Sequence, residues 1–209
     1  MKNAGKHAEE FKSLLKKLLK DRPDDKHEPV DSIRALVVGG LMFDAPDSRV
    51  DDAMKVIEKE FVDFNELRVA TDLEIQDLVG SRYPNIEKRV SNITQALNAI
   101  FEKEHTLSLI RLKEISKRDA RQFLRDLPGM NAFMEAYVML VSLDGSTLPV
   151  DETTLSALKS KGITEPDTIP EDAQKFLEHN IKSEDYYHAF LALRDWAQDE
   201  AEKTKAKKK

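Results

Sequence analysis

A short turn and a distant carboxylate are the parts of this chain whose residue types could support chemistry. The turn consists of Leu127, Pro128, Gly129, Met130 and Asn131. Backbone N–H groups at the start of a helix have no partner within that helix, so the helix after the turn can hold a phosphate. Asp151 follows Phe133 by eighteen residues, and we expect its carboxylate to reach a ligand that the turn holds.

The segment before the turn carries a ridge of basic side chains. The ridge consists of Lys117, Arg118, Arg121 and Arg125. Positive charge attracts a polyanion and backbone amides position it, so a ridge that leads into such a turn fits phosphate binding without sequence specificity. The alternative is a solvated helix face whose charges pair with Glu114, Asp119 and Asp126.

Helices are expected to position these residues. No stretch of the sequence shows the alternation of apolar and polar residues with a period of two that is typical of strands. Helical patterns are expected over residues 30–42, 48–61, 71–79, 86–102, 116–124, 130–143, 152–160, 171–179 and 184–198. An N-terminal helix has Phe11, Leu15 and Leu18 on one face and lysines on the other, which predicts a helix docked on the core. Residues 22–29 contain two prolines and read as a linker. The fold class is therefore predicted to be all-α.

The composition limits the classes of cofactor and partner. The chain has 209 residues, a formal net charge of −6 and no cysteine. The absence of cysteine excludes disulfides, thiolate-held zinc and an iron–sulfur cluster. A negative net charge means that contact with a nucleic acid must use local basic patches. The longest apolar run, residues 35–43, is far too short to span a membrane, so we expect a cytoplasmic protein with no membrane contact.

The turn, the helix after it and Val150-Asp151 resemble the helix-hairpin-helix Gly/Pro–Asp superfamily of DNA glycosylases, the endonuclease III-like proteins. Two weaker segments occur in the order that this family shows: Leu41–Asp47, and Leu78–Tyr83 followed by Lys88 and Ile93. The resemblance implies a two-domain helical fold with a helix-hairpin-helix motif. We expect a six-helix domain over 30–144, a second domain formed by 1–29 and 145–200, and a disordered basic tail over 201–209.

Departures from the family's motifs bear on the activity that the resemblance implies. Family members that cleave the strand use a lysine, and the spacing from Asp151 places Phe133 there, so we expect no lyase activity. Monofunctional relatives act through the aspartate alone, which assigns that catalytic role to Asp151; the same residue also reads as a helix N-cap. Asp44 stands where the family has a glutamine that fills the gap of an extruded base.

The resemblance therefore implies a DNA-binding protein of the base-excision-repair type, and more specifically a monofunctional glycosylase that cleaves an N-glycosidic bond. The alternative is a catalytically inactive, endonuclease III-like DNA-binding or scaffold protein. A third reading is a protein-partner role with attraction supplied by the lysine-rich tail. The expected partner is double-stranded DNA, bound largely without sequence specificity by a monomer associated with the nucleoid.

The hairpin carries two further expectations. In this family its carbonyl groups can ligate a monovalent cation, which corresponds to Arg125, Leu127 and Met130 here; no other cofactor and no metal is expected. Asn131 replaces the second glycine of the motif, and asparagine tolerates a left-handed backbone better than other non-glycine residues. We therefore expect the turn to survive this replacement.

Overall fold

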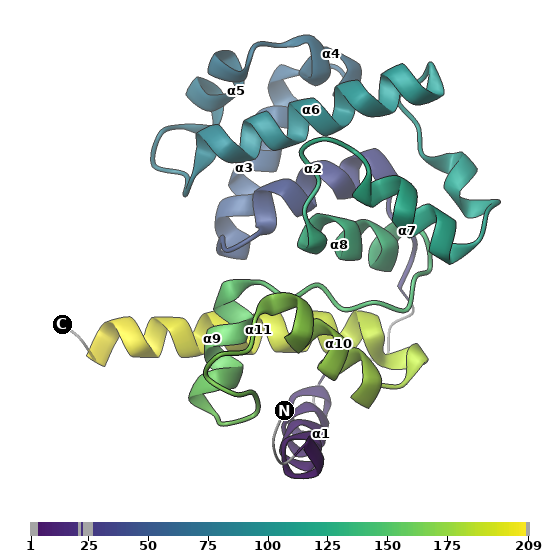
Figure 1. The fold of residues 1–209 in the computed structure, drawn as a ribbon. Coiled ribbons are helices and arrows are strands. Elements are labelled where there is room, and N and C mark those ends of the chain that lie inside the picture. Colours follow the sequence, from purple (N-terminus) through teal and green to yellow (C-terminus); the bar gives the residue numbers. More distant parts are fainter. Residues whose placement is uncertain (1–3, 21, 23–26, 208–209) are drawn as a thin grey trace. The chain divides into compact units, whose positions relative to one another are not determined.

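The computed structural model describes residues 4–20, 22 and 27–207, and these residues form helices without any strand (Figure 1). The all-α prediction is confirmed. The helices are α1 Ala4–Leu19, α2 Ser32–Met42, α3 Asp47–Glu60, α4 Phe64–Val69, α5 Asp72–Val79, α6 Ile86–Glu104, η1 Ile110–Lys113, α7 Lys117–Arg125, α8 Ala132–Ser142, α9 Glu152–Ser160, α10 Pro170–Asn180, η2 Ser183–Asp185 and α11 Tyr186–Lys207. Residues 23–26 of the expected linker and residues 208–209 of the expected tail lie outside the described residues.

The chain divides into two compact units. The hairpin unit comprises Pro29–Gly145, and the terminal unit comprises Met1–Glu28 together with Ser146–Lys209. The hairpin unit holds α2 to α8, and the terminal unit holds α1 and α9 to α11. No helix among the described residues is long and apolar enough to cross a membrane.

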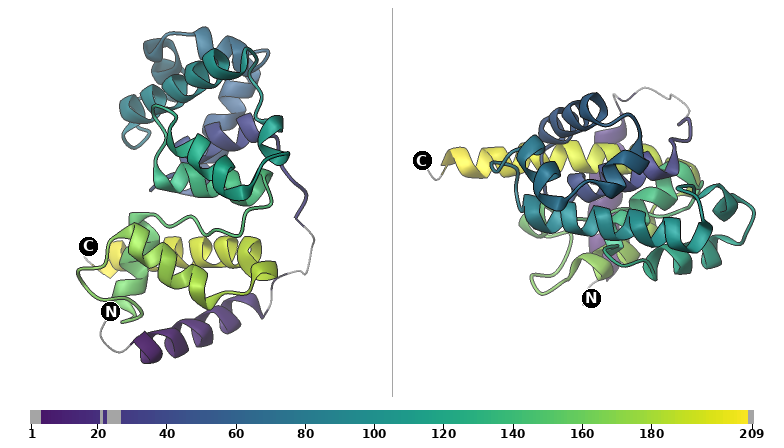
Figure 2. Two further views of the ribbon diagram at one scale, coloured as in Figure 1. Left: turned by 45° about the vertical axis from the view of Figure 1, so that its right-hand side comes forward. Right: turned by 90° about the horizontal axis from the view of Figure 1, so that it is seen from above.

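Helix α2 forms the centre of the hairpin unit, where it packs against α3, α6 and α8 (Figures 1 and 2). Two adjacent glycines allow this close packing. A Cβ atom on Gly39 would lie 3.1 Å from the ring of Tyr137 in α8, and one on Gly40 would lie 2.5 Å from Ile93 in α6. Larger residues at these positions would push α8 and α6 away from α2.

The C-terminal end of α2 is fixed by two side chains from the segment before α6 and from α6 itself. The hydroxyl of Tyr83 donates to the carbonyl of Leu41 at 2.9 Å. Arg89, only 5% exposed, donates to the carbonyls of Gly40 and Leu41 at 3.1 and 2.9 Å. These bonds satisfy carbonyls that have no partner within α2, and they hold in place the loop that begins at Phe43.

Helix α1 docks on α10 and α11 in the terminal unit, as its apolar face predicts. Phe11 is fully buried, and its ring centroid lies 6.2 Å from that of Phe176. The lysines of α1 lie on the exposed side. The basic face is therefore solvated while the apolar face packs on the unit's core.

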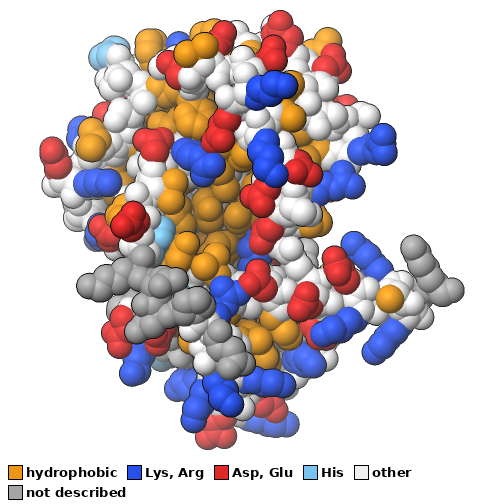
Figure 3. Space-filling model, turned by 180° about the vertical axis from the view of Figure 1, so that it is seen from behind, with side chains coloured by type: hydrophobic (Ala, Val, Ile, Leu, Met, Phe, Trp, Pro, Cys, Tyr) orange, Lys and Arg blue, Asp and Glu red, His pale blue; other side chains and the backbone are white. Residues whose placement is uncertain are grey.

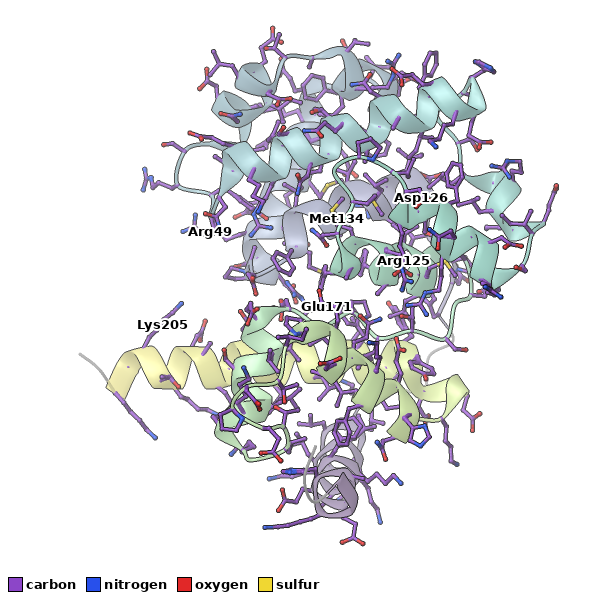
Figure 4. The ribbon with its side chains drawn as sticks, viewed as in Figure 1. Arg49, Arg125, Asp126, Met134, Glu171 and Lys205 are labelled. Carbon is purple, nitrogen blue, oxygen red and sulfur yellow. The ribbon has the colours of Figure 1, made fainter. Side chains whose placement is uncertain are left out.

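The C-terminal segment differs from the expected disordered tail over 201–209, because α11 continues to Lys207. Alanine, glutamate and lysine favour helix. Lys203 Nζ pairs with Glu200 Oε1 at 3.0 Å, and lysines near a helix C-terminus interact favourably with the helix dipole. The last turn of α11, which carries Lys205, extends beyond the other helices of the terminal unit (Figures 2 and 4).

Candidate functional site

The hairpin between α7 and α8 depends on Gly129. This residue has φ +79°, and a Cβ atom there would lie 2.1 Å from the carbonyl oxygen of Asn92 in α6. Glycine is thus required both for the left-handed backbone and for the close approach to α6. Leu127 anchors the other side of the turn, since it is only 3% exposed.

Asn131 has a different role from the one that the sequence suggested. Its backbone is extended, with φ −122° and ψ 171°, so the turn does not use the left-handed conformation that asparagine tolerates. Asn131 is instead the N-cap of α8, and its side-chain oxygen accepts from the N–H of Met134 at 2.9 Å. An N-cap requires an extended backbone, which explains why asparagine can replace a second glycine here.

Three backbone donors remain at the start of α8. The N–H of Met130 donates to the carbonyl of Leu127 at 3.2 Å, which closes the turn. In the described part of the chain, the N–H groups of Gly129, Asn131 and Ala132 have no protein acceptor. Ala132 is exposed, and Gly129 and Asn131 are partly exposed. Such a group of donors at a helix N-terminus can bind an anion.

The basic ridge on α7 pairs with an acid that the sequence did not identify. Arg121 Nε lies 2.7 Å from Glu135 Oε1, and Arg125 Nε lies 3.0 Å from Glu135 Oε2. Glu135 belongs to α8 and is 1% exposed. Figure 4 shows Arg125 at the end of α7, beside α8.

The other polar side chains of α7 have local partners or are exposed. Lys117 Nζ donates to the carbonyl of Leu143, whereas Arg118 is exposed. The acids proposed as alternative partners have local roles: Asp119 accepts from the Ser116 hydroxyl at 2.7 Å, and Asp126 accepts from Gln122 at 2.8 Å. Arg121 and Arg125 of the ridge therefore pair with Glu135 and not with the acids that the alternative named.

Phe133, at the position of the family's lysine, is part of an aromatic cluster. It is 3% exposed, and its ring lies edge-on to Phe43 at 5.6 Å and parallel to Tyr137 at 6.3 Å, between centroids. Aromatic pairs at these separations stabilise packing. The cluster provides no nucleophile at this position.

Asp151 is held in the terminal unit by interactions that include a helix cap and an ion pair. As N-cap of α9, its Oδ1 accepts from the N–H of Thr154 at 2.8 Å. Its Oδ2 accepts from Nη1 of Arg194 in α11 at 3.2 Å. Asp151 is 2% exposed and Arg194 is 4% exposed. The expected cap is present, whereas no pattern in the residues pointed to the arginine, which lies 43 residues away.

Acidic residues follow the end of α2. Asp44 adopts φ +52°, in the loop that Tyr83 and Arg89 hold, and Asp47 is the first residue of α3. Among the described residues, no group of three His, Cys, Asp or Glu side chains is arranged to hold a metal ion. At the hairpin, the carbonyl of Leu127 accepts the turn hydrogen bond from Met130; the monovalent-cation site stays a prediction.

Comparisons with known proteins place the fold. No family model and no curated protein matches the chain. A trapped covalent intermediate of endonuclease III with DNA is similar at TM-score 0.71 and 17% identity, over 90% of this chain and 84% of that one. An 8-oxoguanine glycosylase/lyase of Clostridium acetobutylicum in complex with double-stranded DNA gives TM-score 0.71 and 17% identity, over 96% and 71% of the two chains.

A third match extends over nearly the whole of the other protein's chain. The 3-methyladenine DNA glycosylase of H. pylori bound to 1,N6-ethenoadenine gives TM-score 0.69 and 14% identity, over 93% of this chain and 98% of that one. The resemblance inferred from the hairpin and Asp151 is thereby confirmed at the level of fold. This cysteine-free chain has the helical, endonuclease III-like fold of the helix-hairpin-helix DNA glycosylases.

Proposed function

We propose that this chain is a DNA-binding protein of the base-excision-repair type that contacts double-stranded DNA through residues 127–131. The observation that carries the proposal is the set of three N–H donors of Gly129, Asn131 and Ala132, which have no acceptor among the described residues. The fold adds support, because two of the similar structures are complexes with DNA.

The recognition that we propose is largely independent of base sequence. Backbone amides contact phosphates, and phosphates position a protein on DNA without carrying sequence information. The net charge of −6 supports a local contact at the hairpin over a general electrostatic attraction. The proposal extends to a monomer associated with the nucleoid in the cytoplasm.

Replacing Ala132 by proline tests the hairpin contact. Ala132 is the first residue of α8, where proline is tolerated, and the extended backbone of Asn131 is compatible with a following proline. The change removes one donor without disturbing α8. We expect Ala132→Pro to weaken duplex binding about tenfold in fluorescence anisotropy.

Ala132→Ser is the matched control, because it keeps the N–H group. We expect this variant to bind as the wild type does. Equal binding by Ala132→Pro and Ala132→Ser would contradict the hairpin contact, provided that both variants have the wild-type circular dichroism spectrum.

For the chemistry, a second candidate function is monofunctional hydrolysis of an N-glycosidic bond with Asp151 as the acidic residue. A carboxylate can stabilise the oxocarbenium-like sugar or orient the attacking water. The endonuclease III-like fold favours this candidate. The pairing of Asp151 with Arg194 favours the alternative, a catalytically inactive DNA-binding protein, because both carboxylate oxygens already have donors.

Excision assays distinguish these two candidates. Duplexes that carry alkylated, oxidised or deaminated bases are incubated with the wild type and with Asp151→Asn, below the unfolding temperature of each. If Asp151 is catalytic, the variant loses excision activity by about a hundredfold or more. Equal activity of the two proteins removes Asp151 from the mechanism, and a wild type that excises none of these bases supports the inactive protein.

Borohydride trapping tests the proposed absence of lyase chemistry. Phe133 cannot form the Schiff base that borohydride reduces, so we expect no covalent adduct with a duplex that contains an abasic site. A trapped adduct would show that another amine takes the place of the lysine.

A further inference from the structure

We propose that Arg125, oriented by the buried carboxylate of Glu135, is a preformed fork for a phosphodiester group beside the one that the hairpin amides hold. The inference rests on the proposed DNA binding. It assigns a contact to one arginine of the ridge and a positioning role to Glu135.

Glu135 is placed to orient two arginines. It is the fourth residue of α8, one turn beyond the hairpin, and it is 1% exposed. Each of its oxygens accepts one Nε–H group, from Arg121 at 2.7 Å and from Arg125 at 3.0 Å. A buried carboxylate bound in this way fixes the plane of each guanidinium group, because both bonds are charge-assisted.

Arg125 keeps its outer donors available. Its side chain is 54% exposed and its ion pair with Glu135 uses only Nε, so the Nη1 and Nη2 groups have no partner in the described part of the chain. Two parallel Nη–H groups match the spacing of two oxygens of a phosphate. Arg121 is less exposed, at 28%, and serves as the inner anchor of the same carboxylate.

The position of Arg125 fits a strand that reaches the hairpin. Arg125 ends α7, and the turn begins two residues later at Leu127. Two arginines against one glutamate leave the cluster with a net charge of +1, so Glu135 orients the fork without cancelling its attraction for an anion. The single lysine of the ridge, Lys117, is bonded to the carbonyl of Leu143.

The competing explanation is that Glu135 only clamps α7 to α8. The two explanations predict opposite changes in DNA affinity when Glu135 loses its charge. Removing a negative charge near bound DNA should tighten binding through electrostatics alone. If Glu135 positions the fork, Glu135→Gln instead weakens binding, because Arg125 must then be ordered on association. We expect a loss of about threefold to tenfold in affinity.

Glu114→Gln is the matched control for Glu135→Gln, since Glu114 is exposed and lies just before α7. It removes the same charge without touching the arginines, and we expect slightly tighter binding. If Glu135→Gln, like the control, binds DNA more tightly than the wild type, the positioning role of Glu135 is overturned.

Variants at the exposed arginine keep the inference testable if Glu135→Gln folds poorly. Arg125→Lys retains the charge but lacks the fork, so we expect it to weaken binding nearly as much as Arg125→Met. Arg125→Met should lower the slope of log K against log salt by about one. Lys59→Met, a charge loss on α3 between Glu58 and Glu60, is the control and should leave the slope unchanged.

The assay is fluorescence anisotropy with a duplex, with chloride replaced by inorganic phosphate at equal ionic strength in a second series. Arg125→Lys binding like the wild type, or Arg125→Met behaving like Lys59→Met, overturns the fork. Displacement of the duplex by micromolar inorganic phosphate would also overturn it, because the site would then be one for free phosphate. If the wild type binds no duplex, the proposed function itself is refuted. If only Ala132→Pro loses duplex affinity and the Arg125 and Glu135 variants keep it, the fork alone is refuted.

Discussion

At the scale of single residues, Asp151 and Arg194 form a buried pair whose two members depend on each other. Removing one partner of such a pair leaves an uncompensated charge in the interior. We expect Arg194→Met to lower the free energy of unfolding by about 3–5 kcal/mol in urea denaturation. Lys12→Met on the exposed face of α1 should change it by less than about 0.5 kcal/mol.

A double-mutant cycle makes this prediction specific. If the two residues act as a pair, the cost of Asp151→Asn and Arg194→Met together is smaller than the sum of the separate costs. Additive costs would mean that the 3.2 Å contact between Nη1 and Oδ2 contributes no net coupling.

The residue types explain how much of the site the sequence could predict. Phe133 was identified by counting from Asp151, and the capping role of Asp151 follows from its position before α9. Glu135 and Arg194 were missed because a buried acid or arginine on an apolar helix has no local signal of its partner. The motif accounts for the tolerance of asparagine at position 131, but not for its role, since the structure uses the Asn131 side chain as a cap.

At the scale of elements, the capping box of α5 links helix stability to pH. The backbone N–H and the hydroxyl of Thr71 both donate to Glu74 Oε2 at 2.8 Å. These bonds hold the pKa of Glu74 below its ordinary value of 4.5. A depressed folded-state pKa gives stability that is present above the unfolded-state value and is lost as pH falls through the folded-state value.

We therefore expect Thr71→Ala to lower the unfolding temperature by about 2–4 °C at neutral pH, as measured by circular dichroism. The difference in stability between the wild type and Glu74→Gln should shrink as the pH is lowered through the folded-state pKa of Glu74. A difference that stays constant between neutral and acid pH would rule out the ionised carboxylate as the cause.

The helix boundaries show where the periodicity of the sequence was sufficient to predict a helix. The predicted helix over 152–160 agrees with α9, and those over 86–102 and 171–179 lie within two residues of α6 and α10. The short helix α4 was missed because its six residues are fewer than two turns, too few for a periodic pattern. Its N-cap, Asp63, accepts from the N–H of Glu66 at 2.9 Å, a local signal that was available.

At the scale of the whole molecule, the acidic charge is concentrated away from the hairpin in sequence. Residues 47–79, which form α3, α4 and α5, contain ten acidic and four basic residues and carry a net charge of −6, equal to that of the entire chain. Basic and acidic side chains intermingle on the face of the hairpin unit in Figure 3. The chain therefore has no general positive field, and DNA binding of the kind proposed must be a short-range contact.

This charge distribution predicts a long-range repulsion of DNA and a separate short-range contact, which a salt series distinguishes. Asp51 and Asp52 are exposed on α3, so Asp51→Asn with Asp52→Asn should fold normally and reduce long-range repulsion of DNA. We expect faster association with duplex DNA at about 0.01 M salt, where charges interact over about 30 Å. The gain should disappear near 1 M salt, where this length is about 3 Å.

Ala132→Pro provides the contrast, because it removes a direct hydrogen bond and should weaken binding at every salt concentration where binding is measurable. Stopped-flow anisotropy of both variants against the wild type, over a salt series, measures the association and dissociation rates. A gain for the double asparagine variant that persists at high salt would place α3 in direct contact with DNA. Direct contact of DNA with α3 would then contribute to binding. That result would contradict a short-range contact centred on residues 127–131.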